Sequence, residues 1–489
     1  TQSDAKTRLP PCIPLPLEHK LLVTVIEKAK DWALMHGVGM RDKKHFTKDS
    51  IQIAPFVLLP SPFPSTEFNK AVELQPVLNE LMHKVAHDVE FLEHTLQNAL
   101  QVDEFTANLY DIWIKVREEG ITQSISLGLF RSDYLMQCTE ANVIKQVEFN
   151  TIASSFGAIT SNLPAIYILR QLGHGDLIKK MPENGALSGL CSGIIEAYDL
   201  FGVANAIVIF VVEEVSYNIC DQRFHEFEIS EKRPDIMVNI LTRTLNELYE
   251  ETTGIYCLGV VTSILYREGR PVAVVYYRSG YEPSQYPSSR EWDARLRVER
   301  SSAIKCPSIQ YQLAGTKKVQ QTLASPGVLE KFMGTGATTN SVRDIFTGLY
   351  SLDFDESGER AVDMALADAE RFVLKPQREG GGNNLYGPDV REALLRMRHS
   401  RERAAYILME RILPPLVSGY VVRPGAPVPP PLCDLVSELG IFGVIIGTKE
   451  KIFSNRQVGH MLRTKLADAN EGGVAAGLGA LDSPFLLDS

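Results

Sequence analysis

Paired cysteines, long apolar runs and an excess of positive charge are all lacking in this 489-residue sequence. The seven cysteines are scattered and odd in number, with neither C-x-x-C zinc spacing nor the pattern of a disulfide framework. This usage is typical of the reducing cytosol, where we expect the protein. No apolar run approaches the roughly 18 residues of a membrane span, and the polar first residues lack the apolar core of a signal peptide. We therefore expect neither membrane insertion nor secretion.

The charge balance narrows the class of partner. Fifty Lys and Arg against sixty Asp and Glu give a net charge of −10. This argues against nucleic acid or an anionic membrane as the main partner, although a local basic site for a small anion remains open. With 44% hydrophobic and 22% charged residues the composition is that of an ordinary globular protein. Its length exceeds what one core usually covers, so two or three lobes are expected.

Helical patterns dominate the first part of the chain. Apolar residues recur at helical spacing from Leu22 to Ala33, and Gly37 is a plausible stop. A longer helical stretch covers 65–101, where we expect Pro76 to break or kink the helix. Another covers 103–119 and is closed by Gly120. Within the longer stretch His83 and His87 have metal-ligand spacing, but no third ligand is apparent, so a surface helix is the preferred interpretation.

Strand patterns begin near residue 125. The tracts 205–214 and 271–277 have the continuous apolar character of buried parallel strands. Helical material such as 233–250 lies between them, which predicts an α/β lobe over roughly 203–312. Further strands are expected around 371–375, 404–412 and 436–446, separated by glycine-rich turns.

The stretch FVLKPQREGGGNNLYG, residues 372–387, carries the first candidate site. Three apolar residues suggest a buried strand that ends at Lys375, and a triple glycine follows. A glycine-rich turn between strands can fold over a polyphosphate and offer its backbone N–H groups. Lys375 would then meet phosphate as a point charge, and Glu379 could hold the magnesium that accompanies a nucleotide. The alternative is a flexible surface hairpin.

The stretch QVEFNTIASSFG, residues 146–157, carries the second candidate site. Side chains alternate in a strand, so Glu148 and Asn150 share one face while Val147 and Phe149 share the other. Two neighbouring oxygen donors suit Mg²⁺, which prefers hard ligands. A solvent-facing polar edge would give the same pattern.

Two shorter patterns suggest anion binding. In HMLRTKLADANEGGVAAG, residues 460–477, Arg463 and Lys465 share a face and precede a second glycine loop. In RSDY, residues 131–134, Arg131 follows an apolar strand. Both patterns also fit a solvated charged strand followed by a turn.

Taken together, these motifs resemble the eukaryotic-type glutathione synthetases, which have the ATP-grasp fold. The resemblance runs from about residue 105 to 485 and keeps the family's order: RSDY, VEFNTIASSFG, AVVYYRSGY, QLAGTKKVQQ, FVLKPQREGGGNNLYG, YILMERI, SELGIFG, and MLRTK with EGGVAAG. It implies an α/β fold in which an ATP-grasp body carries an inserted parallel-sheet substrate lobe and a glycine-rich lid. We expect the body in 1–202 and 313–489, the substrate lobe in 203–312 and the lid in roughly 345–430.

The resemblance also implies a role for each matching residue. Glu148, Asn150 and Glu379 match the family's Mg²⁺ ligands, and Arg131, Lys317, Lys375 and Arg463 are expected to be catalytic. Positions that match nucleotide contacts are Glu148, Lys317, Lys375, Pro376, Gln377, Arg378, Glu379, Gly380, Gly381, Gly382, Asn383, Asn384, Tyr386, Met409, Glu410, Arg411, Ile412, Glu438, Lys465 and Glu471. Positions that match peptide-substrate contacts are Arg131, Ile152, Ala153, Ser154, Ser155, Ser216, Asn218, Gln222, Arg278, Ser279, Gly280, Tyr281, Arg463, Val474 and Ala475.

The implied activity is the ATP-dependent joining of γ-glutamylcysteine to glycine through an acyl phosphate. Glycine is favoured because Ala475 and Ala476 are the small pair of glycine-using members. The chain departs from the family at Ser216-Tyr217, where Glu-Arg is usual, at Cys220, where an aromatic is usual, and at Ala153, where a serine is usual. The missing charges raise the question of how the γ-glutamyl end is held.

Three other functions remain possible at this point. The first is a related ligase with a different acceptor, such as β-alanine, or a different γ-glutamyl donor. The second is a nucleotide-binding regulatory protein that has lost turnover, although the sequence keeps every magnesium ligand and phosphate-binding lysine. The third, a structural scaffold, leaves the glycine loops unexplained. The expected partners are small molecules, and the resemblance implies a homodimer.

Overall fold

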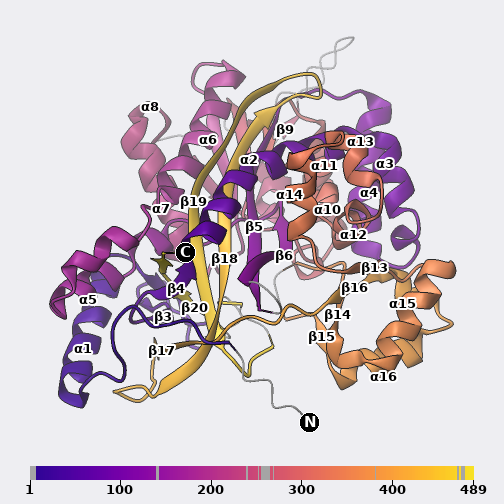
Figure 1. Cartoon of the computed structure of the whole chain (residues 1–489). Helices are drawn as coiled ribbons and strands as arrows, with labels where there is room; N and C mark the ends of the chain where they lie inside the picture. The colour runs from indigo at the N-terminus through magenta and orange to yellow at the C-terminus, as the bar shows by residue number, and fades with distance from the viewer. Residues whose placement is uncertain are drawn as a thin grey trace.

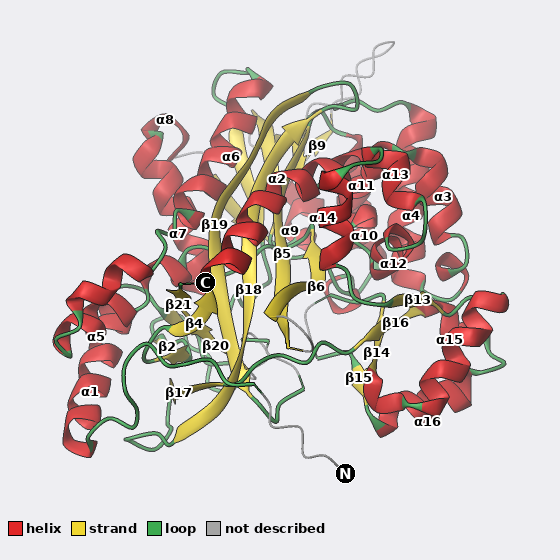
Figure 2. Ribbon diagram, viewed as in Figure 1, coloured by secondary structure: helices red, strands yellow, loops and turns green. Residues whose placement is uncertain are grey.

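A large twisted sheet runs through the molecule with helices on both of its faces, and a smaller lobe projects from one side (Figures 1 and 2). The computed structural model describes residues 7–138, 142–237, 240–251, 253–254, 265–267, 269–379, 382–470, 473–474 and 479–488. Among the described residues no helix is both long enough and apolar enough to cross a membrane.

The α-helices of the described residues are distributed along the whole chain. They are α1 (His19–Met35), α2 (Ser65–His87), α3 (Val89–Leu96), α4 (Glu104–Glu119), α5 (Ala165–Gln171), α6 (Ala186–Phe201), α7 (Ile219–Lys232), α8 (Pro234–Met237), α9 (Leu245–Glu251), α10 (Ser289–Arg300), α11 (Ile309–Ala314), α12 (Lys317–Leu323), α13 (Val328–Met333), α14 (Ala337–Ile345), α15 (Glu356–Ala367) and α16 (Pro388–Met397).

The strands alternate with these helices. They are β1 (Gly39–Met40), β2 (Gln52–Ile53), β3 (Phe56–Val57), β4 (Ser61–Pro64), β5 (Ser126–Cys138), β6 (Asn142–Asn150), β7 (Ile207–Val211), β8 (Ile240–Arg243), β9 (Thr253–Gly254), β10 (Leu265–Arg267), β11 (Arg270–Tyr277), β12 (Ile304–Cys306), β13 (Leu349–Ser351), β14 (Phe372–Pro376), β15 (Leu385–Tyr386), β16 (Tyr406–Glu410), β17 (Val417–Val422), β18 (Leu432–Gly447), β19 (Ile452–Leu466), β20 (Gly479–Asp482) and β21 (Pro484–Leu487).

The long antiparallel pair β18 and β19 forms the middle of the large sheet, next to β5 and β6. Side chains of a strand alternate between the two faces, and β18 shows this clearly. Ile441 and Ile445 pack into the core beneath α2, whereas Val444 and Ile446 pack into the core beneath α6. Burial on both faces explains why residues 439–446 are apolar or glycine throughout.

Four parallel strands extend this sheet in the order β8, β7, β11 and β12. β12 joins them to β5, with Lys305 opposite Ser126. The buried tracts expected at 205–214 and 271–277 are confirmed as β7 and β11, whose side chains are almost completely buried. The carboxyl ends of β8, β7 and β11 therefore meet at one edge of the sheet.

The smaller lobe has its own sheet, in the order β13, β16, β14 and β15, covered by α15 and α16. Figure 1 shows it apart from the body, with β14 and β15 facing the central strands. β14 and β16 confirm the strands expected around 371–375 and 404–412. β14 places Lys375 near the end that faces the body.

Two helix predictions hold and three expectations were wrong. α1 buries the apolar stripe from Leu22 to Ala33, and α4 ends at Gly120, whose φ of 99° suits glycine. Pro76, by contrast, lies inside a continuous α2; the chain breaks at Asp88, which caps α3 by accepting from the Phe91 N–H at 2.9 Å. Packing against β18 and β19 holds the helix together across the proline. The helical stretch expected at 233–250 is interrupted by β8, because it completes the parallel sheet beside β7.

His83 is the third correction, since it is buried instead of lying on a surface helix. Its Nε2 donates to the carbonyl of Thr448 at 2.9 Å, so its Nδ1 accepts from the Tyr311 hydroxyl at 2.6 Å. Burial lowers the pKa of His83 from 6.5 to about 4, and burial likewise lowers the pKa of His460 to about 4.

We expect stability to fall between pH 6.5 and pH 4, because the unfolded chain binds protons at these two histidines before the folded protein does. For His460 alone the loss of unfolding free energy at pH 4 is about 3 kcal/mol. Urea unfolding of His460→Gln across this range should show a shallower pH dependence than the parent. The exposed His45→Gln variant is the control. Parallel curves for the parent and His460→Gln would contradict the assignment.

Candidate active site

The predicted site residues meet in a cavity of about 210 Å³ between the central strands and the smaller lobe. β5, β6, β18 and β19 supply one wall, and β14, β15 and the loop between them supply the other. The predicted residues that line it are Arg131, Glu148, Asn150, Ile152, Ala153, Ser155, Tyr281, Lys317, Lys375, Arg378, Glu379, Asn383, Asn384, Tyr386, Glu438, Arg463, Lys465 and Val474. Segments more than 300 residues apart in sequence thus form one site.

Glu148 and Asn150 both face this cavity, while Phe149 between them is buried in the core. The amide nitrogen of Asn150 donates to the Arg131 carbonyl at 3.2 Å and to Asp133 Oδ2 at 3.0 Å. These bonds fix which end of the amide is the nitrogen. The Asn150 amide oxygen is left without a hydrogen bond to any described residue, so it can accept a ligand.

Lys317 joins the two sides of the site. It is the first residue of α12, and its Nζ lies 2.9 Å from Glu148 Oε2 on β6 and 2.8 Å from Glu379 Oε1 in the loop after β14. A single ammonium therefore neutralises two carboxylates that come from different lobes. The described residues contain no cluster of three His, Cys, Asp or Glu that could hold a metal. Two carboxylates and one amide oxygen are nevertheless a hard-oxygen set that suits Mg²⁺ when phosphate oxygens complete the shell.

The two carboxylates differ in their electrostatic setting. Burial would raise the pKa of Glu148, but Lys317, Lys375 and Arg463 outweigh it and hold that pKa below its usual range. Burial, opposed by Lys317 and reinforced by Glu148, raises the pKa of Glu379 to about 7. Glu148 is thus the firmly ionised member, and Glu379 is the one whose charge depends most on an added cation.

The β14 end of the small lobe contacts the body through polar bonds. Lys375 is buried and its Nζ donates to the Val147 carbonyl at 2.8 Å. Gln377 accepts from the Lys318 N–H at 3.0 Å, and Arg378 pairs with Asp103. Burial lowers the pKa of Lys375 despite the nearby Glu148. Pro376 and Gln377 lie beside the cavity without lining it.

A buried carboxylate that the motif analysis did not assign orders the opposite wall. Asp133 accepts from Arg131 Nε at 2.6 Å and from Arg131 Nη2 at 2.8 Å. Arg463 Nη2 lies 3.5 Å from the same carboxylate, and it also pairs with Glu438. Asp133 is two residues from Arg131 in β5, so strand alternation alone would have placed both on one face.

Glycine at position 440 provides the space for this cluster. Gly440 lies opposite Asp133 in the β18–β5 ladder. A Cβ there would lie 2.9 Å from both Arg131 Cδ and Asp133 Oδ1. Any larger residue would therefore displace the arginine.

The predicted substrate residues of the parallel-strand lobe mostly lie outside the central cavity. Arg278 is buried and pairs with Asp221 at 2.7 Å. Asp221 also accepts from the N–H groups of Phe156 and Ala158, so it ties the loop after β6 to this lobe. Only Tyr281 reaches the central cavity from the lobe. The members of the lobe that do not line it are Ser216, Asn218, Gln222, Arg278, Ser279 and Gly280; Ser154, in the loop after β6, does not line it either.

The residues expected around adenine are on β16 and just beyond it. Met409 and Ile412 are buried, and Glu410 pairs with Arg371 at 2.5 Å. The Arg411 guanidinium lies 6.0 Å from the centre of the Tyr386 ring, which lines the cavity. Residues 409–412 therefore do not line the cavity, and Gly382 does not line it either.

Four predicted positions lie outside the described residues: Gly380, Gly381, Glu471 and Ala475, together with the neighbouring Ala476. The cavity also has lining residues that carried no functional signal in the sequence. They are Leu135, Val147, Phe156, Asn470 and Gly473.

Comparison with known proteins identifies the family of the chain. The eukaryotic glutathione synthase ATP-binding domain matches residues 19–486. The chain is 43% identical to the glutathione synthetase of Rattus norvegicus over 474 residues, which covers 96% of this chain and 98% of the rat protein. This chain belongs to the eukaryotic glutathione synthase family.

Two further relatives extend the comparison across this family. The glutathione synthetase of Homo sapiens is 42% identical over 472 residues, covering 95% of this chain and 97% of the human protein. The chloroplastic glutathione synthetase of Arabidopsis thaliana is 37% identical, covering 96% of this chain and 86% of the plant protein.

Among solved structures, a glutathione synthetase-like effector from Globodera pallida matches with a TM-score of 0.76. It covers 96% of this chain and 98% of its own, at 24% identity. This likeness supports the α/β fold expected from the sequence.

Asp133 offers a test of how the arginines are held. In Asp133→Asn the buried Arg131 loses its counter-charge, and we expect the free energy of unfolding to fall by about 3 kcal/mol. Urea unfolding monitored by fluorescence measures this change. Asp488→Asn is the matched control, because it removes a carboxylate from an exposed pair with Lys180 and should leave the midpoint unchanged. Equal midpoints for Asp133→Asn and the parent would show that the cluster does not depend on this charge.

Proposed function

We propose that this protein is an ATP-dependent ligase that joins γ-glutamylcysteine to glycine and forms glutathione, ADP and phosphate. Membership of the glutathione synthase family supports this activity. The observation that carries it is the convergence of Lys317, Lys375, Arg131 and Arg463 on one cavity with Glu148 and Glu379. The lining holds more cations than carboxylates, which suits a phosphoryl transfer, in which the protein mainly positions reactants and neutralises charge.

The reaction requires no side-chain nucleophile. The cysteinyl carboxylate of the donor attacks the γ-phosphorus of ATP, the bond to the β–γ bridging oxygen breaks, and ADP leaves. The glycine amine then attacks the acyl carbon of the acyl phosphate, and phosphate leaves while the amine loses a proton. Arg131 and Arg463 face the cavity from the same wall and are placed to orient carboxylates. Lys317 and Lys375 are placed to neutralise the phosphates.

Glu148, Asn150 and Glu379 would hold Mg²⁺ in this proposal. The free amide oxygen of Asn150 and the two carboxylates that already converge on Lys317 support this assignment. Bound Mg²⁺ would supply charge neutralisation to the nucleotide phosphates.

The small lobe would act as a lid. Its contacts with the body include those of Lys375, Gln377 and Arg378, at the end of the strand that borders the cavity, and the pair of Asp353 with Lys318. Closure over bound nucleotide would exclude water, so that the acyl phosphate meets an amine. A homodimer, a cytosolic location and a preference for glycine over β-alanine stay predictions from the sequence.

The activity is tested by phosphate release from ATP and Mg²⁺ with γ-glutamylcysteine, with and without glycine, β-alanine or serine. We expect release that depends on both the dipeptide and glycine. Release that is greatest with β-alanine would overturn the acceptor. If no acceptor supports phosphate release although ATP is bound, γ-glutamylcysteine is not the donor, and the proposed reaction is overturned.

A carboxylate variant tests the metal assignment. In Glu379→Gln the site loses the ligand that reaches it from the lid, so we expect the Mg²⁺ concentration for half-maximal rate to rise at least about tenfold. Glu392→Gln, on the exposed side of α16, is the control with the same charge change on the same lobe. An unchanged Mg²⁺ requirement in Glu379→Gln would remove this residue from the metal shell.

A further inference from the structure

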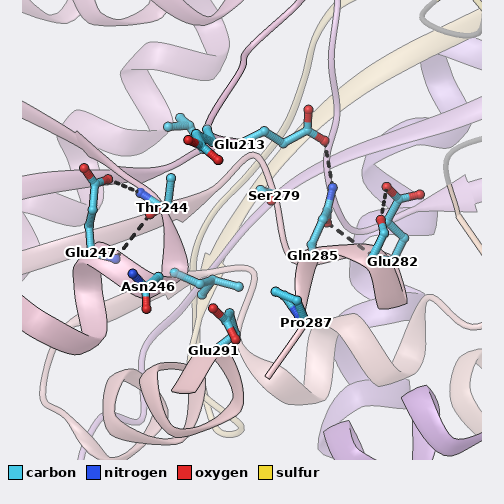
Figure 3. Close-up of a pocket in the computed structure, with 13 residues that line it drawn as sticks. Glu213, Thr244, Asn246, Glu247, Ser279, Glu282, Gln285, Pro287 and Glu291 are labelled. Atoms are coloured by element: carbon cyan, nitrogen blue, oxygen red, sulfur yellow. Dashed lines mark hydrogen bonds between the residues drawn. The ribbon is translucent and has the colours of Figure 1, made fainter. Parts of the chain in front are cut away.

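A second cavity, of about 570 Å³, opens at the carboxyl ends of β7, β8 and β11 (Figure 3). This is the edge of a parallel sheet at which ligands usually bind. Its polar lining is predominantly acidic. The glutamates that line it are Glu213, Glu214, Glu247, Glu282 and Glu291.

Three of these carboxylates accept hydrogen bonds at the N-termini of helices. Glu247 accepts from the Thr244 N–H at 2.7 Å. Glu282 accepts from Ser284 Oγ at 2.7 Å, within the capping box of the short helix at 283–285. Glu291 accepts from the Ser288 N–H at 2.9 Å and caps α10. Figure 3 shows the Glu247 and Glu282 contacts on opposite sides of the cavity.

Glu213 has no such role. One of its oxygens, Oε1, accepts from Gln285 Nε2 at 2.8 Å and lies 3.5 Å from the Tyr281 hydroxyl. The amide orientation of Gln285 is set by its own oxygen, which accepts from the N–H groups of Gly280 and Tyr281. The second oxygen, Oε2, makes no hydrogen bond with any described residue. No cation of the described chain lies within ion-pair distance of this half-buried carboxylate.

Ser279, which lines the same cavity, also has a hydroxyl that is open to a ligand. Ser279 is only 4% exposed and lines the same cavity. Its hydroxyl makes no hydrogen bond within the described part of the chain. Figure 3 draws Ser279 among the lining residues of the cavity, together with Glu213 and Gln285. A half-buried carboxylate that forms no ion pair, with only the more distant Lys43 acting on it, lines the same cavity as an unpartnered hydroxyl and favours a ligand that brings an ammonium group.

The cavity adjoins the proposed active site. Tyr281 lines the central cavity, and its hydroxyl lies 3.5 Å from Glu213 Oε1. Glu213 is therefore one side chain away from the place where the donor carboxylate would react. A γ-glutamyl group that extends past Tyr281 would carry its α-ammonium toward this carboxylate.

We propose that Glu213, with Ser279, binds the α-ammonium of the γ-glutamyl donor; this deepens, and rests on, the proposed ligase function. Ser216 stands where the family resemblance implies a glutamate, so the chain lacks a charge at that position. Glu213 supplies a carboxylate three residues upstream. Burial raises the pKa of Glu213, Gln285 lowers it and Glu282 raises it; an ammonium in contact would favour the ionised form.

The test compares two donors that differ only in the α-amino group. They are γ-glutamylcysteine and N-glutarylcysteine, in which hydrogen replaces the amino group. KM for each, KM for ATP and kcat are measured for the parent, Glu213→Gln and Glu214→Gln. Glu214→Gln is the matched control, because it removes the same charge one residue further along, on an exposed side chain of the same cavity. Calorimetric binding of each donor gives a second readout that does not depend on turnover.

We expect Glu213→Gln to raise KM and Kd for γ-glutamylcysteine at least about tenfold, since a charge-assisted contact is lost. KM for N-glutarylcysteine and for ATP should change less than about twofold. An equal loss with both donors would show a structural role and overturn the proposal. An unchanged KM for γ-glutamylcysteine would also overturn it.

The outcomes separate this proposal from the ligase function. If the parent forms no product, but Glu213→Gln binds the donor more weakly than the parent, the role of Glu213 stands and the proposed reaction is rejected. If the parent forms product, but Glu213→Gln binds the donor as tightly as the parent, the reaction stands and the role of Glu213 is rejected. Absence of γ-glutamylcysteine binding by the parent protein would reject both.

Discussion

The contact on which the site depends is the ammonium of Lys317 held between Glu148 and Glu379. Glu148 comes from the central sheet, Glu379 from the small lobe and Lys317 from the first turn of α12. Removing these three charged groups from water is costly unless each has an opposite charge close by, and here the Lys317 ammonium contacts both carboxylates. Burial would lower the pKa of Lys317, but the two carboxylates raise it, so this residue stays charged. The relative position of the lobes is therefore tied to the same atoms that would meet the nucleotide.

The remaining polar groups of the site are organised by two buried aspartates with different partners. Asp133 holds Arg131 and contacts Arg463 within the central sheet. Asp221 holds Arg278 and the loop after β6, so the parallel-strand lobe and the central sheet share one anchor. Breaking either pair would leave a buried charge without a partner, which is far more costly than never having had the pair. The positions of the arginines are thus set by carboxylates that need not touch a substrate.

Much of this could be predicted from the sequence, because local periodicity reports local structure. The apolar stripe of α1, the buried strands β7 and β11 and the shared face of Glu148 and Asn150 each follow from spacing alone.

The errors have a common origin in tertiary packing. Pro76 is tolerated because α2 lies against β18 and β19, and β8 forms because β7 offers a free edge. The acidic cavity could not be predicted either, since Glu213, Glu247 and Glu291 meet only through the parallel pairing of three strands. Asp133 could have been found by the alternation that identified Glu148.

One contact has an asymmetric consequence for how this enzyme can vary. Lys375 reaches across to the main-chain carbonyl of Val147, and a main-chain acceptor is present whatever the side chain is. Exchange of Val147 for another residue leaves that acceptor in place, whereas exchange of Lys375 for an apolar residue removes the donor. Genetic change can therefore loosen this link between the lobes from the lid side far more readily than from the body side. Substitution of Val147 therefore leaves this contact intact, and the contact depends on the side chain of Lys375.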